Sequence, residues 1–512
     1  MSLTRRLSPG LGRLLLRPRR RNVATLETEV RDGIVPAGES LAQTTDLTGG
    51  AAHSPNYRTV ALIVACALFM EHLDATVLAT ALPTMARDFG VAATEMSVAL
   101  TSYLLALAIF IPASGVIADR FGARTVFQLA IVLFTVSSIA CGLAPNLATM
   151  VVARFVQGLG GAMMMPVGRL VLLRAVAKED LVSAMQWLLM PALIGPIIGP
   201  PLGGVIVTYL NWRWIFWLNV PMGIAGVALV ARFIAETREP EARRFDGLGF
   251  LLSSLALGGL LCGFEVVSRH AGGRLAPPLF AVSALCGGLY LVHARRTPNP
   301  LLDISLMRIP TFGLSVWGGS LTRITQGAQP FLLPLMMQLA FGFTAARSGA
   351  ITVATTLGSF AMKAFAKRIL RRFGFRTSLI ALGVLGTLAY AVCGFFRPSW
   401  PLPVVFAVLV ACGFLMSFQF TAYNTLAYDQ ISKARMSAAI SFYATFQQLM
   451  LSLGICTGAA ALQVSMSLSH HHAPGFDDFS TAFWTVTAIS LTAVFVNLRF
   501  APDAGADLSG RP

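Results

Sequence analysis

Two acids stand inside the first long apolar run of the sequence. Glu71 and Asp74 are three residues apart, so on a helix both side chains lie on one face. An ionised acid at the centre of a membrane-spanning helix costs about 2.5–3.5 kcal/mol on insertion scales, and such residues usually face a partner or a wet cavity. Their mutual repulsion and their removal from water favour at least one of them holding a proton near neutral pH. That is the chemistry of a proton carrier.

Two arginines stand inside other apolar runs. Arg154 is followed by Gln157 one turn later, and Arg323 is followed by Gln326. Because a guanidinium stays protonated in proteins, we expect Arg154 to act electrostatically, by changing how tightly a nearby acid holds its proton. A structural ion pair between Arg154 and Asp74 is the competing interpretation. For Arg323, balancing an acid, contacting an anionic substrate group and structural pairing all stay open.

Other chemistries lack the residues that they need. The chain has no G-x-x-x-x-G-K-[ST] phosphate loop and no H-E-x-x-H zinc motif, so neither ATP nor a catalytic zinc is expected. The glycines of 158–161 lie inside an apolar run rather than after a strand, which excludes dinucleotide binding. His470–His472, beside Asp477 and Asp478, form either a metal site or, as we favour, a solvated loop. We therefore predict a protein that is not an enzyme and has no cofactor and no metal.

Composition places these charges in lipid. The chain has 512 residues, of which 55% are hydrophobic, and its mean hydropathy is +0.69. Charged residues make up 12%, about half of the roughly 25% typical of soluble domains. The formal net charge of +16 does not indicate nucleic acid, because the basic residues form short clusters between apolar runs. We expect a lipid bilayer around the protein and no nucleic-acid partner.

Fourteen apolar runs, among them 95–117, 125–144 and 214–234, come close to the roughly 20 residues that a spanning helix needs. With both termini on one side, 31 of the 39 lysines and arginines fall on that side and six on the other. Positive charge marks the cytoplasmic side, so the asymmetry favours an even number of helices with both ends in the cytoplasm. We predict 14 helices, rather than 12 or 13, in the cell's inner membrane. Glu265 lies near the outer end of the seventh run, where an interfacial position is expected.

A short repeat divides the runs into two halves. Asp119–Thr125, with the sequence DRFGART, recurs as Arg371–Thr377, with the sequence RRFGFRT. The copies are eight predicted helices apart, two more than a duplicated six-helix unit requires. We therefore predict an all-α membrane protein of two six-helix bundles and two inserted helices, with the substrate site between the bundles. The predicted parts are a basic tail (1–58), an N-terminal bundle (59–236), the inserted helices (247–294), a C-terminal bundle (312–498) and a second tail (499–512).

Four motifs in the first half carry a family resemblance. They are a loop signature with Gly115, Asp119, Arg120, Gly122 and Arg124, the run Arg154–Ala162, a helix motif with Gly195, Gly199, Pro200, Gly203 and Gly204, and the run Leu73–Pro83. In this order they resemble the motifs of the major facilitator superfamily, and within it those of the fourteen-helix drug:proton antiporters. Gly161–Leu170 and Met362–Lys363 resemble multidrug transporters of that subfamily.

The resemblance implies roles for these residues. Asp74 lies in the helix 1 motif, which favours it over Glu71 as the acid of proton coupling or substrate binding. Arg154, in the helix 4 motif, would tune that acid. The glycines and prolines of 195–204 would allow a tight contact between helices of opposite halves, which limits proton leakage. The loop at Asp119 would act as a conformational latch, although topology-setting charge explains part of it.

Two export functions stay open. The resemblance implies a proton-coupled antiporter that exports drugs or other lipophilic or cationic toxic compounds. The same fold would also serve the export of an endogenous metabolite, such as an organic acid, a sugar or a siderophore. Arg154 and Arg323 favour anions, whereas Glu71 and Asp74 favour cations. We expect a monomer whose partners are a small-molecule substrate, protons and lipid. The arginine-rich segment Met1–Arg21 is interpreted either as a disordered tail or as a membrane-surface segment.

Overall fold

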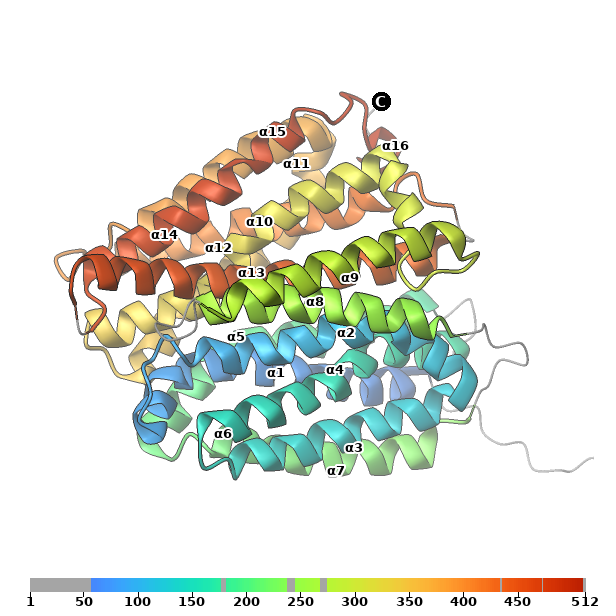
Figure 1. The fold of residues 1–512 in the computed structure, drawn as a ribbon, viewed down its shortest axis with the longest axis horizontal. Helices are drawn as coiled ribbons and strands as arrows, with labels where there is room; N and C mark the ends of the chain where they lie inside the picture. Colours follow the sequence, from blue (N-terminus) through green and yellow to red (C-terminus); the bar gives the residue numbers. More distant parts are fainter. Residues whose placement is uncertain are drawn as a thin grey trace, which may run out of the picture. The chain divides into compact units, whose positions relative to one another are not determined.

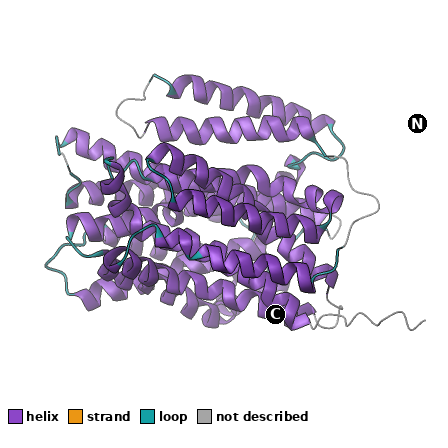
Figure 2. Cartoon of the chain, turned by 90° about the horizontal axis from the view of Figure 1, so that it is seen from below, coloured by secondary structure: helices purple, strands orange, loops and turns teal. Residues whose placement is uncertain are grey.

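The computed structural model describes most of the chain beyond the N-terminal tail. The described residues are 57–175, 181–236, 245–267, 274–432, 435–471 and 473–509. Within these ranges all regular secondary structure is helical and there is no strand (Figure 2). The predicted basic tail, 1–58, lies outside the described residues except for its last two, which begin the first helix.

The first half of the described chain folds into one group of helices, drawn in blue and green in Figure 1. Its elements are α1 (Tyr57–Phe89), α2 (Ser97–Phe121), α3 (Ala123–Gly142), α4 (Leu147–Ala175), α5 (Leu181–Tyr209), α6 (Trp214–Trp217) and α7 (Asn219–Phe233). Long apolar runs become helices because a backbone in lipid must satisfy its own hydrogen bonds. The break between α6 and α7 has a local cause: Pro221 has no N–H to donate to the carbonyl of Trp217.

The second half forms a similar group, preceded by a helical hairpin. The hairpin is α8 (Gly247–Val267) and α9 (Ala276–Arg296), followed by a short 3₁₀ helix at Ile304–Arg308. The second group consists of α10 (Pro310–Leu335), a π-helical turn (Met336–Ala340), α11 (Ala345–Cys393), α12 (Leu402–Ala427), α13 (Met436–Leu468), α14 (Phe476–Leu491), α15 (Ala493–Asn497) and α16 (Ala506–Ser509). The hairpin helices lie side by side, and α8 also packs on α2 and α13 (Figure 1).

Among the described residues, eleven helices are long and apolar enough to cross a membrane. One of these, α11, is bent at Gly374, where φ is 73°, so its 49 residues form two consecutive helical segments. Two further long helices, α5 and α10, complete the groups, although their described residues are not both long and apolar enough to be counted with these eleven. The predicted all-α membrane fold is confirmed, whereas the count of 14 and the predicted domain limits stay predictions.

Two glycine turns recur in the two groups of helices. Gly90 and Gly342 each have a φ of 67°, and Gly122 and Gly374 have φ values of 98° and 73°. The members of each pair are 252 residues apart. Glycine adopts positive φ at little cost, which explains its use in these turns. We call the end of the helices that carries Gly90 and Gly342 the loop-90 end, and the end that carries Gly122 and Gly374 the arginine-rich end.

The arginine that follows each turn at the arginine-rich end makes the same contact. Arg124 donates from Nη2 to the carbonyl of Ala231 at 2.7 Å. Arg376 donates from Nη2 to the carbonyl of Leu498 at 3.1 Å. Each bond ties the helix after the turn to the end of the last long helix of its own half. The repeat found in the sequence is therefore also a repeat of structure.

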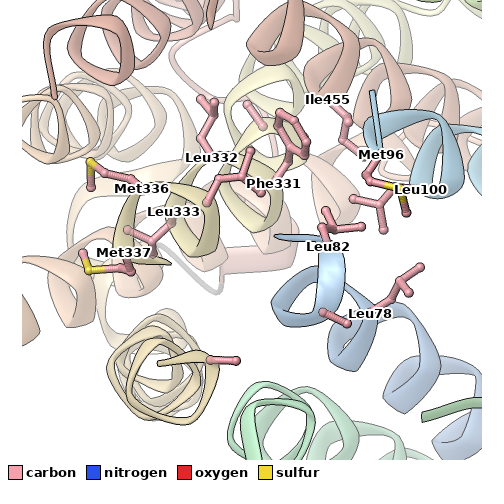
Figure 3. Packing of buried hydrophobic residues seen from close by; sticks show 14 of the residues in the cluster. Leu78, Leu82, Met96, Leu100, Phe331, Leu332, Leu333, Met336, Met337 and Ile455 are labelled. Carbon is pink, nitrogen blue, oxygen red and sulfur yellow. The ribbon is translucent and has the colours of Figure 1, made fainter. Parts of the chain in front are cut away.

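The two halves meet through one apolar cluster towards the loop-90 end. Figure 3 shows its centre, formed by Leu78, Leu82, Met96 and Leu100 of the first half and by Phe331, Leu332, Leu333, Met336, Met337 and Ile455 of the second. The other apolar clusters among the described residues do not join α1–α7 to α10–α15. Burial of apolar side chains therefore holds the halves together at one end and not at the other.

Backbone contacts between α5 and α11 reinforce this closure. A Cβ on Gly204 would lie 2.4 Å from the carbonyl oxygen of Ala345, and a Cβ on Gly349 would lie 2.1 Å from that of Pro200. No real side-chain atom fits at such distances, so these glycines let the two backbones touch. The amide of Ala346 also donates to Thr208 Oγ1 at 2.9 Å. The structure thus represents a state that is closed at the loop-90 end.

Candidate functional site

An ion pair lies at the centre of the first half. Arg154 on α4 donates from Nη1 to Asp74 Oδ2 on α1 at 2.5 Å, and both side chains are fully buried. The Nε of Arg154 donates to the carbonyl of Ala99 at 3.2 Å, and its guanidinium carbon lies 4.5 Å from the ring centroid of Tyr103. Three helices, α1, α2 and α4, therefore hold this one arginine in place.

Neutral side chains complete the coordination of Asp74. Its Oδ1 accepts hydrogen bonds from Gln157 Nε2 at 3.1 Å and from Asn219 Nδ2 at 2.9 Å. Asn219, the first residue of α7, also contacts Ser138 Oγ at 3.0 Å. Removing the charge of Asp74 here would leave Arg154 buried without a counter-charge, which typically costs about 3–5 kcal/mol. In this state the geometry matches the structural ion pair considered for the two residues.

Glu71 lies one turn from Asp74 and outside this network. Its side chain is buried, and its Oε2 has no hydrogen-bond partner in the described part of the chain. The basic group in electrostatic range is Arg169 on α4, whose own Nε is buried and without a hydrogen-bond partner among the described residues. A buried carboxyl oxygen without a donor is costly unless the group is neutral or gains a partner. The two acids that share one helical face thus have different surroundings.

The structure places Arg323 apart from the other predicted site residues. It lies on α10 in the second half and is 2% exposed. Its guanidinium carbon is 4.6 Å from the ring centroid of Phe420 and 5.7 Å from that of Tyr443. The neighbouring Gln326 instead donates to the carbonyl of Met416 at 3.4 Å. Arg323 therefore does not join the network of Asp74 and Arg154.

The predicted helix motif on α5 faces two ways. Cβ atoms added to Gly195, Gly199 and Gly203 would all meet α1, the nearest atoms belonging to His72, Thr76 and Thr80 respectively. These glycines are four residues apart and so lie on one helical face. Gly204 and the carbonyl of Pro200 face α11 of the other half. The motif thus packs α5 inside its own half as well as across the boundary.

The loop signature lies at the arginine-rich end. Gly115 has open space around its Cβ position, and Asp119 and Arg120 lie in the last turn of α2. The guanidinium carbon of Arg120 is 5.7 Å from the ring centroid of Phe121. A Cβ on Gly122 would collide with Glu236, whose carboxylate accepts a hydrogen bond from Thr125. These contacts of Gly122 and Thr125 with Glu236, and that of Arg124 with Ala231, stay within the first half, so the latch role remains a prediction.

Sequence reasoning missed several members of the site. Asn219 is a lone amide in the apolar run 214–234. Polar residues inside a spanning helix usually face a partner in the bundle, so its position alone could have marked it as a site residue. Arg169 was considered only as part of a resemblance. The interfacial position expected for Glu265 stays a prediction, but the structure adds that this acid is buried in the protein: it is 8% exposed, and its carboxylate accepts hydrogen bonds from Ser97 and Thr101 of α2, both at 3.3 Å.

The histidine loop shows one short polar contact. His471 Nδ1 lies 2.8 Å from Asp478 Oδ2, which also accepts a hydrogen bond from the amide of Gly475 at 2.9 Å. Within the described ranges, no three His, Cys, Asp or Glu side chains are grouped so that they could hold a metal ion. His472 itself lies outside the described residues.

Comparisons with known proteins agree on one family. The family model described as Major Facilitator Superfamily matches residues 64–455 and, in a second match, 316–510. "Probable transport protein HsrA" of Haemophilus influenzae is 37% identical over 429 residues, covering 83% of this chain and 91% of that protein. "Putative multidrug resistance protein MdtD" of Salmonella heidelberg is 36% identical over 431 residues, covering 81% and 90%. A crystal structure of an auto-inhibited POT family peptide transporter has a TM-score of 0.65 at 14% identity and covers 87% of this chain and 97% of its own, a likeness of fold alone.

Proposed function

The chain belongs to the Major Facilitator Superfamily and is a transporter rather than an enzyme, and from this premise we propose that it exports lipophilic, drug-like compounds in exchange for protons. The observation that carries the proposal is the pair of acids at membrane depth. Asp74 is held by Arg154, Gln157 and Asn219, whereas the buried Oε2 of Glu71 has no described partner. The name of the MdtD relatives supports multidrug cargo.

In this mechanism Glu71 carries the proton and Asp74 does not. An acid that gains and loses a proton must not be held in a permanent salt bridge or by a permanent set of hydrogen-bond donors. Glu71 meets that condition, because its buried Oε2 has no described partner. The ion pair of Asp74 and Arg154 stays neutral as a unit and keeps α1 and α4 in register beside Glu71. The sequence motif favoured Asp74, and the geometry leads us to assign the coupling role to Glu71 instead.

The closed loop-90 end supports an alternating cycle. We assign this end to the outside of the cell, because lysines and arginines are concentrated at the opposite end. When the loop-90 end opens, Glu71 takes up a proton from outside, and when it closes again the proton leaves towards the cytoplasm. One charge that crosses 100 mV supplies about 2.3 kcal/mol, enough to drive transport without a nucleotide.

The test uses the purified full chain in proteoliposomes with an imposed pH gradient. A pH-sensitive dye reports proton movement while a panel of lipophilic compounds is added to wild type, Glu71→Gln, Asp74→Asn and Glu95→Gln. Glu95 serves as the control acid because it lies in the turn between α1 and α2, outside the helices. We expect substrate-dependent proton flux in wild type and Glu95→Gln, and none in Glu71→Gln. Gradient-free exchange of labelled substrate should persist in Glu71→Gln, because that exchange needs no net proton transfer.

Two results would count against this mechanism. If Glu71→Gln still couples substrate to protons, Glu71 is not the carrier. If no compound of the panel moves protons while wild type exchanges substrate, the transporter is not a proton antiporter.

A further inference from the structure

Arg323 has no counter-charge among the residues that the structure describes. It is 2% exposed, and its Nη1 has no hydrogen-bond partner in the described part of the chain. It makes no ion pair with any described residue, whereas the equally buried Arg154 is paired with Asp74. Burying an unpaired charge is costly, so proteins normally pair it or use it for ligands and ions. An anion would supply the counter-charge that the described residues do not provide.

The described surroundings of Arg323 are aromatic, and no acid is among the groups that act on it. The rings of Phe420 and Tyr443 face its guanidinium at 4.6 Å and 5.7 Å. The titratable groups in electrostatic range are the phenols of Tyr423, Tyr428 and Tyr443, which come from α12 and from α13. Phenols and ring faces stabilise a cation without neutralising it. The charge thus remains available to a ligand that enters beside the rings.

The same region is also reached from the first half of the molecule. Tyr428, at the end of α12, lies within electrostatic range of Arg323 in its own half and of Arg169 on α4 in the other half. The Nε of Arg169 is also buried and without a described partner. Two guanidinium groups with unused donors, one in each half, therefore act electrostatically on the same tyrosine. Transporters of this architecture bind substrate between their halves.

We propose that Arg323 binds an anionic group of the substrate, such as a carboxylate or a sulfonate, and that Phe420 and Tyr443 contact an apolar or aromatic body next to it. The transported compounds are then lipophilic organic anions rather than cations. This assignment rests on the proposed function as an exporter of lipophilic compounds and narrows its substrate class. A guanidinium suits the role because its planar donors match a carboxylate with two parallel hydrogen bonds.

The test compares three ligands that share one ring system and differ in charge. Equilibrium dialysis of the detergent-purified full chain measures binding of 1-naphthylacetate, 1-naphthylmethylammonium and 2-(1-naphthyl)ethanol, without any pH gradient. We expect the anion to bind at least tenfold more tightly than the cation or the alcohol. Arg323→Gln should weaken binding of the anion at least tenfold and leave binding of the alcohol unchanged.

Two further variants keep the test decisive. Arg323→Lys retains the charge but not the planar donors, so it should bind the anion more weakly than wild type and the alcohol as tightly as wild type, a result that tests the site even if Arg323→Gln does not fold. Arg347→Gln is the matched control, because Arg347 also stacks on a ring, that of Phe343 at 4.0 Å, but is exposed at the loop-90 end. Its anion affinity should equal that of wild type.

The outcomes separate this assignment from the proton-coupling mechanism. Tighter binding of the cation, or equal anion affinity in wild type and both Arg323 variants, overturns the anion site even if proton coupling is found. Anion binding that depends on Arg323, together with the absence of substrate-driven proton flux, upholds the site and overturns antiport.

Discussion

The two halves share a frame but differ in their interiors. Both have glycine turns at equivalent positions, and both tie an arginine to a backbone carbonyl at the arginine-rich end. The π-helical turn adds one residue to the second half, so residues before it correspond at an offset of 251, the separation of Pro83 and Pro334. Asp74 then corresponds to Thr325, whose hydroxyl contacts Ser490 on α14 rather than a charged group.

The comparison shows which features the architecture needs and which belong to one half. Turns with positive φ and carbonyl contacts set the path of the backbone, so both halves keep them. The charged network of Asp74, Arg154 and Asn219 occupies the place that Thr325 and Ser490 fill with two hydroxyls. The first half thus holds the acids, whereas the second half contributes a lone buried arginine.

The largest effect on stability is expected where the halves differ most, at Asp74 in the first half and Thr325 in the second. Asp74→Ala leaves Arg154 buried without a counter-charge, and we expect it to destabilise the protein by about 3–5 kcal/mol. Thr325→Val at the corresponding position removes one neutral hydroxyl and should cost about 0.5–1.5 kcal/mol. Thermal unfolding of both variants in detergent measures the difference.

A double variant checks that charge is the cause. Asp74→Asn with Arg154→Gln removes both charges and should unfold at a higher temperature than Asp74→Ala. Equal melting of the double variant and Asp74→Ala would show that lost packing, rather than an unpaired charge, dominates.

The next effect concerns the contact between the halves. Gly349→Ala places a Cβ 2.1 Å from the carbonyl oxygen of Pro200, so we expect it to disfavour closure of the loop-90 end by about 1–3 kcal/mol. Cross-linking between Thr94→Cys and Gln463→Cys, whose native side chains are hydrogen-bonded at 3.1 Å, reports closure. Gly349→Ala should lower the rate of this cross-linking about tenfold. Gly288→Ala, where the Cβ position is open, is the control and should cross-link like wild type.

A smaller loss of stability is expected at the glycine turns that the two halves share. Gly122→Ala and Gly374→Ala each force a side chain into positive φ, and each should destabilise the protein by about 1–2 kcal/mol. The first also meets Glu236 and should be the more damaging. Thermal unfolding compares the two variants. An unchanged melting temperature for either one would show that the two glycine turns do not play the same part in their halves.

The smallest effect lies at the two arginine contacts. Arg124→Gln and Arg376→Gln each remove one hydrogen bond to a carbonyl at an exposed site, which is worth about 0.5–1.5 kcal/mol. We expect similar, modest decreases in melting temperature. A large decrease for Arg124→Gln alone would indicate that the first copy of the loop has a further role.

Local sequence patterns predicted the helices far better than the site. The apolar runs 95–117 and 125–144 lie within a few residues of α2 and α3, because hydrophobic length sets the position of a spanning helix. The pairing of Asp74 with Arg154 was foreseen as an alternative, since buried charges seek partners. The contribution of Asn219 depends on α7 meeting α1, a contact between distant segments that no local pattern encodes. The lone state of Arg323 likewise depends on which side chains α12 and α13 bring to it.

The position of Glu265 has a consequence for the bilayer itself. On α8 the carboxylate contacts Ser97 and Thr101 of α2, and Cys456 of α13 approaches it at 3.7 Å. Only 22% of the spanning window of α8, and of α9, is buried inside the protein, which leaves most of the hairpin to face lipid tails. A change in membrane thickness that tilts the hairpin therefore acts on the contact between α2 and α13. We therefore expect the lipid composition of the membrane to influence how readily this transporter opens.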